Sequence, residues 1–223
     1  NIITNSKNYV AYSKLFKIYS MIGDFEKSIR IIDEAIDEYP NQKDLKFSRG
    51  MFHLIKGEFE KGWEFYEFRE SIVKDDFFEN LKTWKGENLK NSNILVTSEQ
   101  GMGDVLQFSK YLINLSPYFK KIDFVIYDKL LPIFKKHFKN ITIYKRNEVL
   151  QNDYDYKISL GSLNKYFFKD KSSNSSDLIN FSEARKKRWE LFFKNKKKNI
   201  GLIWSGNFFG PKEPSRSIEL KKL

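Results

Sequence analysis

The spacing of apolar residues along the chain changes near residue 80. Before this point apolar residues recur every three or four positions, which is typical of amphipathic helices. After it, short apolar runs alternate with stretches of helical periodicity. Such alternation is typical of a parallel sheet covered by helices. The pattern therefore predicts an α/β protein with an N-terminal all-α part.

The N-terminal part contains an internal repeat. The segments 11–40 and 45–69 align at an offset of 34 residues, a spacing typical of tetratricopeptide units. The alignment pairs Gly23 with Gly57, Phe25 with Phe59, Ser28 with Gly62 and Ile32 with Tyr66. Small residues after each Gly-x-aromatic turn let paired helices approach closely. We expect four antiparallel helices within residues 9–70, packed as two repeats.

The rest of the chain predicts strands and helices in alternation. The apolar runs that predict strands are 93–97, 122–127, 140–144, 156–160 and 199–204. The helical patterns lie at 104–115, 129–138 and 182–195. We expect a doubly wound parallel sheet, in which ligands bind at the carboxyl ends of the strands. The turns after residues 97, 160 and 204 are therefore candidate sites, and Phe77, Phe78 and Trp84 predict aromatic packing between the repeats and the sheet.

The turn after the first strand, "SEQGMGDVLQF" at 98–108, contains two glycines and an acid at a helix start. It lacks the third glycine of the dinucleotide-binding fingerprint, and Asp104 would repel a pyrophosphate. Asp104 has two interpretations on this pattern. It caps the helix, or it is a general base for an acceptor hydroxyl at the mouth of a cleft.

The segment "WSGNFFGPKEPSRSIEL" at 204–220 also follows a predicted strand. It offers hydroxyl, amide, backbone N–H and cationic groups of the kind that bind a diphosphate. The residues that supply them are Ser205, Gly206, Asn207, Lys212, Arg216 and Ser217. The alternative is an ordinary Gly/Pro turn with solvated charges.

Nothing in the sequence predicts a metal site. The chain has no cysteine, and its two histidines, His53 and His137, lack the spacing of metal ligands. Asp153 and Asp155 have the spacing of a metal-binding DxD motif, but they precede a strand and so lie at the wrong end of the sheet. An exposed strand start is the simpler interpretation.

The net charge of +11 is unevenly spread along the 223 residues. Residues 1–70 carry 11 basic and 12 acidic side chains, and residues 71–223 carry 29 and 17. The basic run at 184–199 is either a solvated helix face or a wall that faces phosphates or anionic lipid. No recognised nucleic-acid-binding module carries these charges, and no apolar run is long enough to span a membrane.

Four stretches resemble a bacterial family in which tetratricopeptide repeats are fused to a GT-B glycosyltransferase similar to the heptosyltransferases (glycosyltransferase family 9). These stretches are "GEFEKGWEFYEFR" (57–69), "WKGENLKNSNILVTSEQGMGDVLQFSKYL" (84–112), "YKISLGSL" (156–163) and "IGLIWSGN…RSI" (200–218). The resemblance implies repeats at 1–78, the N-terminal Rossmann-like lobe at 79–197, and a truncated start of the nucleotide-sugar lobe at 198–223.

The resemblance also implies a reaction and a site. A hexosyl, heptosyl or N-acetylhexosaminyl group would move from a nucleotide sugar to a hydroxyl of a glycan or protein, with no metal and no cofactor. Asp104 would be the base. The acceptor loop would comprise Glu99, Gln100, Gly101, Gly103 and Gln107. The nucleotide sugar would contact Ser205, Gly206, Asn207, Arg216 and Ser217.

A second class of function stays open at this stage. The repeats could form a non-catalytic adaptor that binds a protein partner, beside a degenerate α/β domain. The intact Gly-Met-Gly-Asp turn favours the enzyme. We expect a cytoplasmic protein without a transmembrane segment, with peripheral association at the inner membrane face left open. Because residue 1 is Asn and the chain stops within a motif, we expect a piece of a longer protein that lacks full activity by itself.

Overall fold

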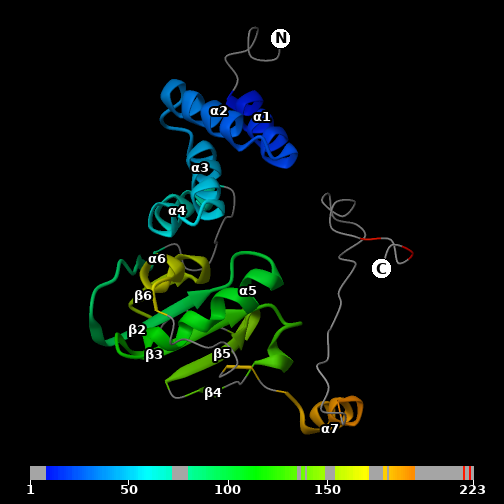
Figure 1. The fold of residues 1–223 in the computed structure, drawn as a ribbon. Helices are drawn as coiled ribbons and strands as arrows, with labels where there is room; N and C mark the ends of the chain where they lie inside the picture. Colours follow the sequence, from blue (N-terminus) through cyan, green and yellow to red (C-terminus); the bar gives the residue numbers. More distant parts are fainter. Residues whose placement is uncertain are drawn as a thin grey trace. The chain divides into compact units, whose positions relative to one another are not determined.

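The computed structural model describes residues 9–71, 80–134, 137–138, 140–148, 154–170, 178–179, 181–193, 218 and 221. The chain divides into two compact units, Asn1–Asn180 and Phe181–Leu223. The first unit holds a group of helices and a sheet, and the second holds helix α7 (Glu183–Phe192) (Figure 1). The predicted strand at 199–204 and the aromatic pair Phe77–Phe78 lie outside the described residues.

Four helices precede the sheet, as the sequence predicts. They are α1 (Tyr9–Ile22), α2 (Phe25–Glu38), α3 (Lys43–Ile55) and α4 (Phe59–Tyr66), and the short 3-10 helix η1 (Glu67–Ser71) follows α4. Helix α1 packs against α2, α3 against α4, and α2 also contacts α3. All of residues 9–70 are described, and none of them forms a strand. The expectation of four helices in this region is confirmed.

The repeated residues lie where the helices turn and where they touch. Gly23 and Gly57 follow α1 and α3 with φ angles of +86° and +79°, in the left-handed region that favours glycine. Ser28 is fully buried in α2, and its hydroxyl donates to the carbonyl of Phe16 over 3.1 Å. At Gly62 an added Cβ would lie 2.5 Å from Cδ2 and 3.0 Å from the backbone N of Leu54. The 34-residue offset thus reproduces two equivalent turns and two close helix contacts.

Among the described residues, the sheet has six strands in the order β1-β6-β2-β3-β5-β4. The strands are β1 (Lys82–Thr83), β2 (Leu89–Thr97), β3 (Phe119–Ile126), β4 (His137–Phe138), β5 (Ile141–Lys145) and β6 (Tyr156–Ser159). Five of them are parallel, and β4 pairs antiparallel with β5. The predicted parallel sheet is therefore confirmed, with the runs at 93–97, 122–127, 140–144 and 156–160 all forming strands.

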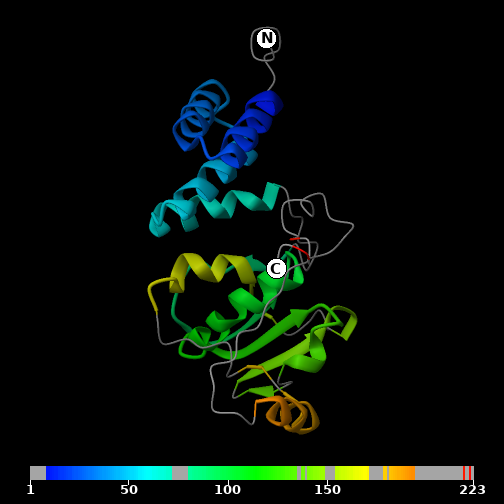
Figure 2. The same ribbon diagram turned by 45° about the vertical axis from the view of Figure 1, so that its right-hand side comes forward.

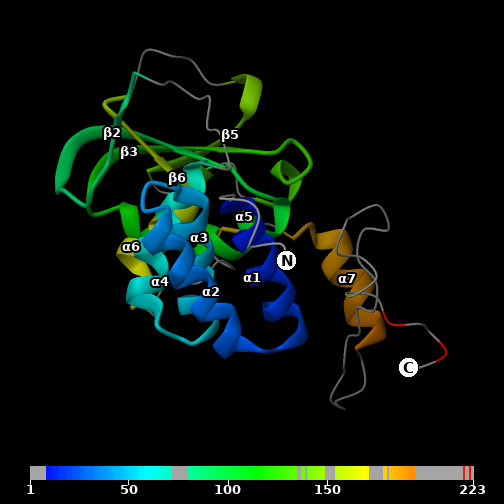
Figure 3. The same cartoon turned by 90° about the horizontal axis from the view of Figure 1, so that it is seen from above.

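Helices cover one face of this sheet. They are α5 (Met102–Phe108), the 3-10 helix η2 (Ser109–Leu115) and α6 (Leu163–Phe167), which lie on the same side of the strands (Figures 1 and 3). Ile94, Leu95 and Val96 in β2 are fully buried, as is usual for a central strand of a parallel sheet. The buried Trp84 packs against rings of the sheet and α6, with its ring centroid 4.8 Å from that of Tyr166. Helix α6 also contacts α4 and lies between α4 and the strands (Figure 2).

Two predicted helices differ from the structure. The pattern at 104–115 forms α5 and then η2, and the change occurs where the Ser109 hydroxyl donates to the carbonyl of Leu106. The helix expected at 129–138 is wrong. Within this segment, the only helical turn that the described residues form is the 3-10 turn η3 (Leu131–Ile133). The helix does not continue because the backbone becomes extended at Phe134. Phe134 is buried against Phe124 and forms a β-bridge with Ile179. The chain then forms β4, which pairs antiparallel with β5. Two further 3-10 turns, η4 (Arg146–Glu148) and η5 (Leu160–Ser162), follow β5 and β6.

The close contact between α3 and α4 leads to a stability prediction. Gly62→Ala should lower the free energy of unfolding by about 1–3 kcal/mol, because the added methyl group strikes the backbone of Leu54 as well as its side chain. Gly103→Ala is the matched control, since no atom lies within 4 Å of its added Cβ. It should be neutral or stabilising by up to about 1 kcal/mol. Urea unfolding of both variants measures the difference, and a Gly62→Ala protein as stable as the wild type would contradict it.

Candidate functional site

Two turns meet at the carboxyl edge of the sheet. Strands β2 and β6 are parallel neighbours, with Thr97 opposite Ser159 in the register. The segment Ser98–Gly101 that follows β2 therefore lies beside η5, which follows β6. Residues 98–104 thus lie at the carboxyl edge, as the sequence predicts. This is the edge where open parallel sheets bind ligands.

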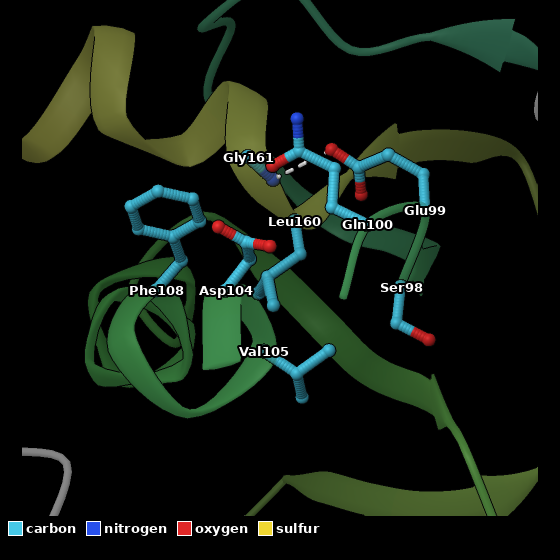
Figure 4. Close-up of a pocket in the computed structure, with 8 residues that line it drawn as sticks. All are labelled: Ser98, Glu99, Gln100, Asp104, Val105, Phe108, Leu160 and Gly161. Carbon is cyan, nitrogen blue, oxygen red and sulfur yellow. Dashed lines mark hydrogen bonds between the residues drawn. The ribbon is translucent and has the colours of Figure 1, made fainter. Parts of the chain in front are cut away.

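A narrow hollow, too tight to admit a water molecule, lies between these turns (Figure 4). Its walls come from β2, the following turn, α5 and η5. The lining residues are Ser98, Glu99, Gln100, Asp104, Val105, Phe108, Leu160 and Gly161. The carboxylate of Asp104 lies between the side chains of Phe108 and Leu160 in this view. The hollow therefore combines an apolar floor with acid and amide groups.

Asp104 is half-buried in the first turn of α5. The N-cap position belongs to Gly101, whose backbone is extended (φ −64°, ψ 162°) and whose carbonyl accepts from the N–H of Val105. Asp104 is the third residue of the helix and does not occupy the N-cap. Its charge still interacts favourably with the partial positive charge of the helix N-terminus. The position leaves the carboxylate available to the hollow.

Arg69, in η1, reaches across from the helices to this edge. Its side chain is 1% exposed. Nε and Nη2 donate to Oε1 of Glu99 over 3.1 and 2.8 Å, and Nη2 also donates to Oγ of Ser162 over 2.8 Å. Nη1 donates to Glu67 and to the carbonyl of Tyr66, and the guanidinium lies 4.8 Å from the Tyr66 ring centroid. Every N–H of the guanidinium thus has a hydrogen-bond partner.

Glu99 is equally enclosed. Its side chain is 4% exposed, and Oε1 accepts a further hydrogen bond from the backbone N–H of Gly161 over 3.1 Å. Burial raises the pKa of Glu99, and Arg69 acts in the opposite direction. Burial opposes the charge of Arg69 too, but the carboxylates of Glu99 and Glu67 raise its pKa. An added Cβ at Gly161 would lie 2.7 Å from Oε1 of Glu99, so a larger residue here would have to displace the buried carboxylate.

Gln100, the next residue of the turn, is held by two tyrosines. The hydroxyl of Tyr66 donates to Oε1 of Gln100 over 2.6 Å, and the hydroxyl of Tyr127 donates to its backbone carbonyl. Burial raises the pKa of Tyr66 to about 12. The phenol therefore stays protonated, and able to donate, even in moderately alkaline solution. Side chains from α4, η1 and the end of β3 together fix the turn.

The structure brings some of the expected site residues together. Glu99, Gln100 and Asp104 all line the hollow, while Gly101, Gly103 and Gln107 are exposed beside it. The expected nucleotide-sugar residues lie outside the described part of the chain: Ser205, Gly206, Asn207, Arg216 and Ser217. Lys212, in the same segment, lies outside it too. Sequence reasoning missed Arg69, Tyr66 and Ser162. They stand in stretches that carry the family resemblance, but no local pattern links residue 69 to residue 99.

The DxD motif lies away from this site. Asp155 immediately precedes β6, and its carboxylate accepts from the backbone N–H of Asn93 over 2.9 Å. This is the opposite end of the strand from η5, as the sequence indicates. Asp153 lies outside the described residues. Within the part of the chain that the structure describes, no cluster of three or more acidic or histidine side chains could hold a metal ion.

Comparisons with known proteins give one distant similarity. The chain is 26% identical to Protein FlbA of Caulobacter vibrioides over 131 residues, which are 55% of this chain and 22% of FlbA. The match thus spans about a fifth of FlbA. No family model matches the chain, and no solved structure matches it. Among the described residues, no helix is both long and apolar enough to cross a bilayer.

The ion pair between Arg69 and Glu99 leads to a second prediction. Arg69→Met should lower the free energy of unfolding by about 3–5 kcal/mol, because it leaves a buried carboxylate without its partner. The double variant Arg69→Met with Glu99→Gln removes that charge and should regain part of the loss. Urea unfolding of the wild type, both single variants and the double variant gives the coupling between the two residues.

The same variant should show a pH dependence of known sign. The pKa of Glu99 is already raised by burial, and loss of Arg69 raises it further. A carboxyl group with a raised pKa in the folded state favours folding when it is protonated. Arg69→Met should therefore be less destabilised at about pH 5.5 than at about pH 8. Equal destabilisation at both values would mean that the buried charge of Glu99 is not the cause.

Proposed function

We propose that this chain is part of a glycosyltransferase that uses a nucleotide sugar, with Asp104 as the general base. One observation carries the proposal: a half-buried carboxylate at the carboxyl edge of a parallel sheet, beside a glycine turn and a hollow. A general base needs contact with its substrate and a protein scaffold that fixes its position. Asp104 lies on such a scaffold.

The proposed reaction makes use of that placement. Asp104 takes the proton of an acceptor hydroxyl on a glycan or protein, and the oxygen attacks the anomeric carbon of the donor. The new bond between carbon and acceptor oxygen replaces the bond to the phosphate, and the nucleoside diphosphate leaves. Backbone N–H groups and cations of the segment 205–217 stabilise the charge on the leaving group. This step needs neither a metal nor a cofactor.

The arrangement of helices and strands also supports the proposal of a tetratricopeptide-repeat glycosyltransferase. Equivalent glycine turns at positions 23 and 57, with small residues at positions 28 and 62, support two tetratricopeptide units. The parallel sheet supports the N-terminal Rossmann-like lobe of a GT-B enzyme. The assignment of residues from 198 onward to a nucleotide-sugar lobe rests on the sequence resemblance alone. We place the reaction in the cytoplasm, where nucleotide sugars are available.

A non-catalytic adaptor is the second candidate, and one observation favours it. Helices α1 and α2 expose large apolar side chains, among them Met21 (81% exposed), Ile22 and Phe25. Such a patch can bind a protein partner. Partner binding by these helices and catalysis at the sheet edge are compatible, so loss of transfer activity on mutation of Asp104 decides between an enzyme and a pure adaptor.

Asp104→Asn in the full-length protein tests the catalytic role. Asparagine keeps the shape of the side chain but cannot accept the proton, so turnover should fall by about 10²–10⁴-fold while the melting temperature stays close to that of the wild type. Asp37→Asn, on the exposed face of α2, is the matched control and should leave turnover unchanged. Turnover is measured with a panel of nucleotide sugars, as sugar transfer where an acceptor is known and otherwise as hydrolysis of the donor. Near-normal turnover in Asp104→Asn refutes the assignment.

A further inference from the structure

Two consecutive residues of the glycine turn are each held by a side chain from the end of the helical part. Arg69 binds Glu99 through two hydrogen bonds, and Tyr66 binds Gln100 through one. The two pairs span 30 and 34 positions in the sequence. Both helical residues are buried, and Arg69 has all its donors engaged. The two contacts thus hold Glu99 and Gln100 directly, in addition to any apolar packing between the helices and the sheet.

The turn needs such fixation because its own sequence provides little. Gly101 and Gly103 flank Met102, and glycine restricts the backbone less than any other residue. No atom lies within 4 Å of a Cβ added at Gly103, so no side chain packs against this side of the start of α5. The orientation of the first turn of α5 therefore depends on what holds the residues just before it.

Those residues connect directly to Asp104. The carbonyl of Gly101 accepts the first hydrogen bond of α5 from Val105, the neighbour of Asp104. Gln100 precedes Gly101 and is fixed at its carbonyl by Tyr127 and at its amide by Tyr66. Glu99 is fixed between Arg69 and Gly161. A shift of the turn would move the carboxylate of Asp104, and a displacement of about 1 Å can cost on the order of 10²-fold in rate.

We propose that Arg69 is a positioning residue, which holds the glycine turn so that Asp104 keeps its catalytic orientation. The inference rests on the proposed function. It makes the helical part a structural component of the active site, and not an independent adaptor joined to it. Arg69 touches no substrate in this role and acts through Glu99.

The test uses Arg69→Lys in the full-length protein. Lysine keeps a positive charge beside Glu99, so the buried carboxylate is not left without a cation. It cannot, however, replace the five fixed donors of the guanidinium. Hydrogen exchange at the backbone amides of residues 99–105 should accelerate by about 10-fold or more, while amides in β3 and β5 keep their wild-type rates. At a temperature where the variant is fully folded, kcat should fall by about 10–100-fold with the donor KM within about threefold of the wild type.

Arg69→Met is the second variant, and Arg30→Met, at an exposed position of α2, is its matched control. Because Arg69→Met also lowers global stability, its exchange should rise throughout the sheet, but at 99–105 it should rise by about 10-fold more than in β3 and β5. Arg30→Met should show neither increase. Two outcomes would overturn the inference: exchange that rises equally throughout the sheet, or a kcat that falls only in proportion to the folded fraction. Either would mean that Arg69 contributes to stability and does not position the turn.

The two proposals fail in different ways. If the full-length protein transfers no sugar but exchange still rises only at 99–105, the turn is held as inferred and the proposed function is wrong. If Asp104→Asn loses turnover while Arg69→Lys keeps both wild-type exchange and wild-type kcat, the function stands and the positioning role is overturned.

Discussion

Burying a guanidinium and a carboxylate is costly unless each group finds several partners, and Arg69 and Glu99 meet this condition only where three segments of the chain come together. The helical part supplies Arg69, Tyr66 and Glu67, the turn after β2 supplies Glu99, and η5 supplies the N–H of Gly161 and the hydroxyl of Ser162. Removing any of these segments leaves a charge or a donor unpaired. The packing of helices on the sheet edge is therefore specified by polar contacts as well as by apolar area.

The topology of the sheet explains why these contacts gather at one place. In the strand order β1-β6-β2-β3-β5-β4, strands β6 and β2 are neighbours although nearly sixty residues separate them along the chain. Their carboxyl ends deliver η5 and the glycine turn to the same edge, and Tyr127 arrives from the end of the adjacent β3. A parallel arrangement thus concentrates turns at a single edge, and polar side chains there meet without long loops.

Much of the fold could be predicted from the sequence because periodicity reports local burial. The 34-residue offset predicts the turns at Gly23 and Gly57, and the apolar runs predict β2, β3, β5 and β6. The helix expected at 129–138 is wrong, because the backbone becomes extended at Phe134, whose ring is buried against Phe124. At the candidate site, glycine spacing predicts the position of Asp104. The contacts of Arg69 and Tyr66 depend on tertiary packing over 30 residues or more, which no local pattern contains.

The two outer strands of the sheet have a consequence for contacts between molecules. Among the described residues, β1 and β4 are each two residues long, and β1 carries an exposed lysine, Lys82. A second chain that added a strand at either margin would find few free backbone groups to pair with, and at β1 it would have to accommodate a charge. Short, charged margins of this kind oppose strand-by-strand growth between copies. The protein can therefore keep long, strongly apolar central strands without offering a template for aggregation.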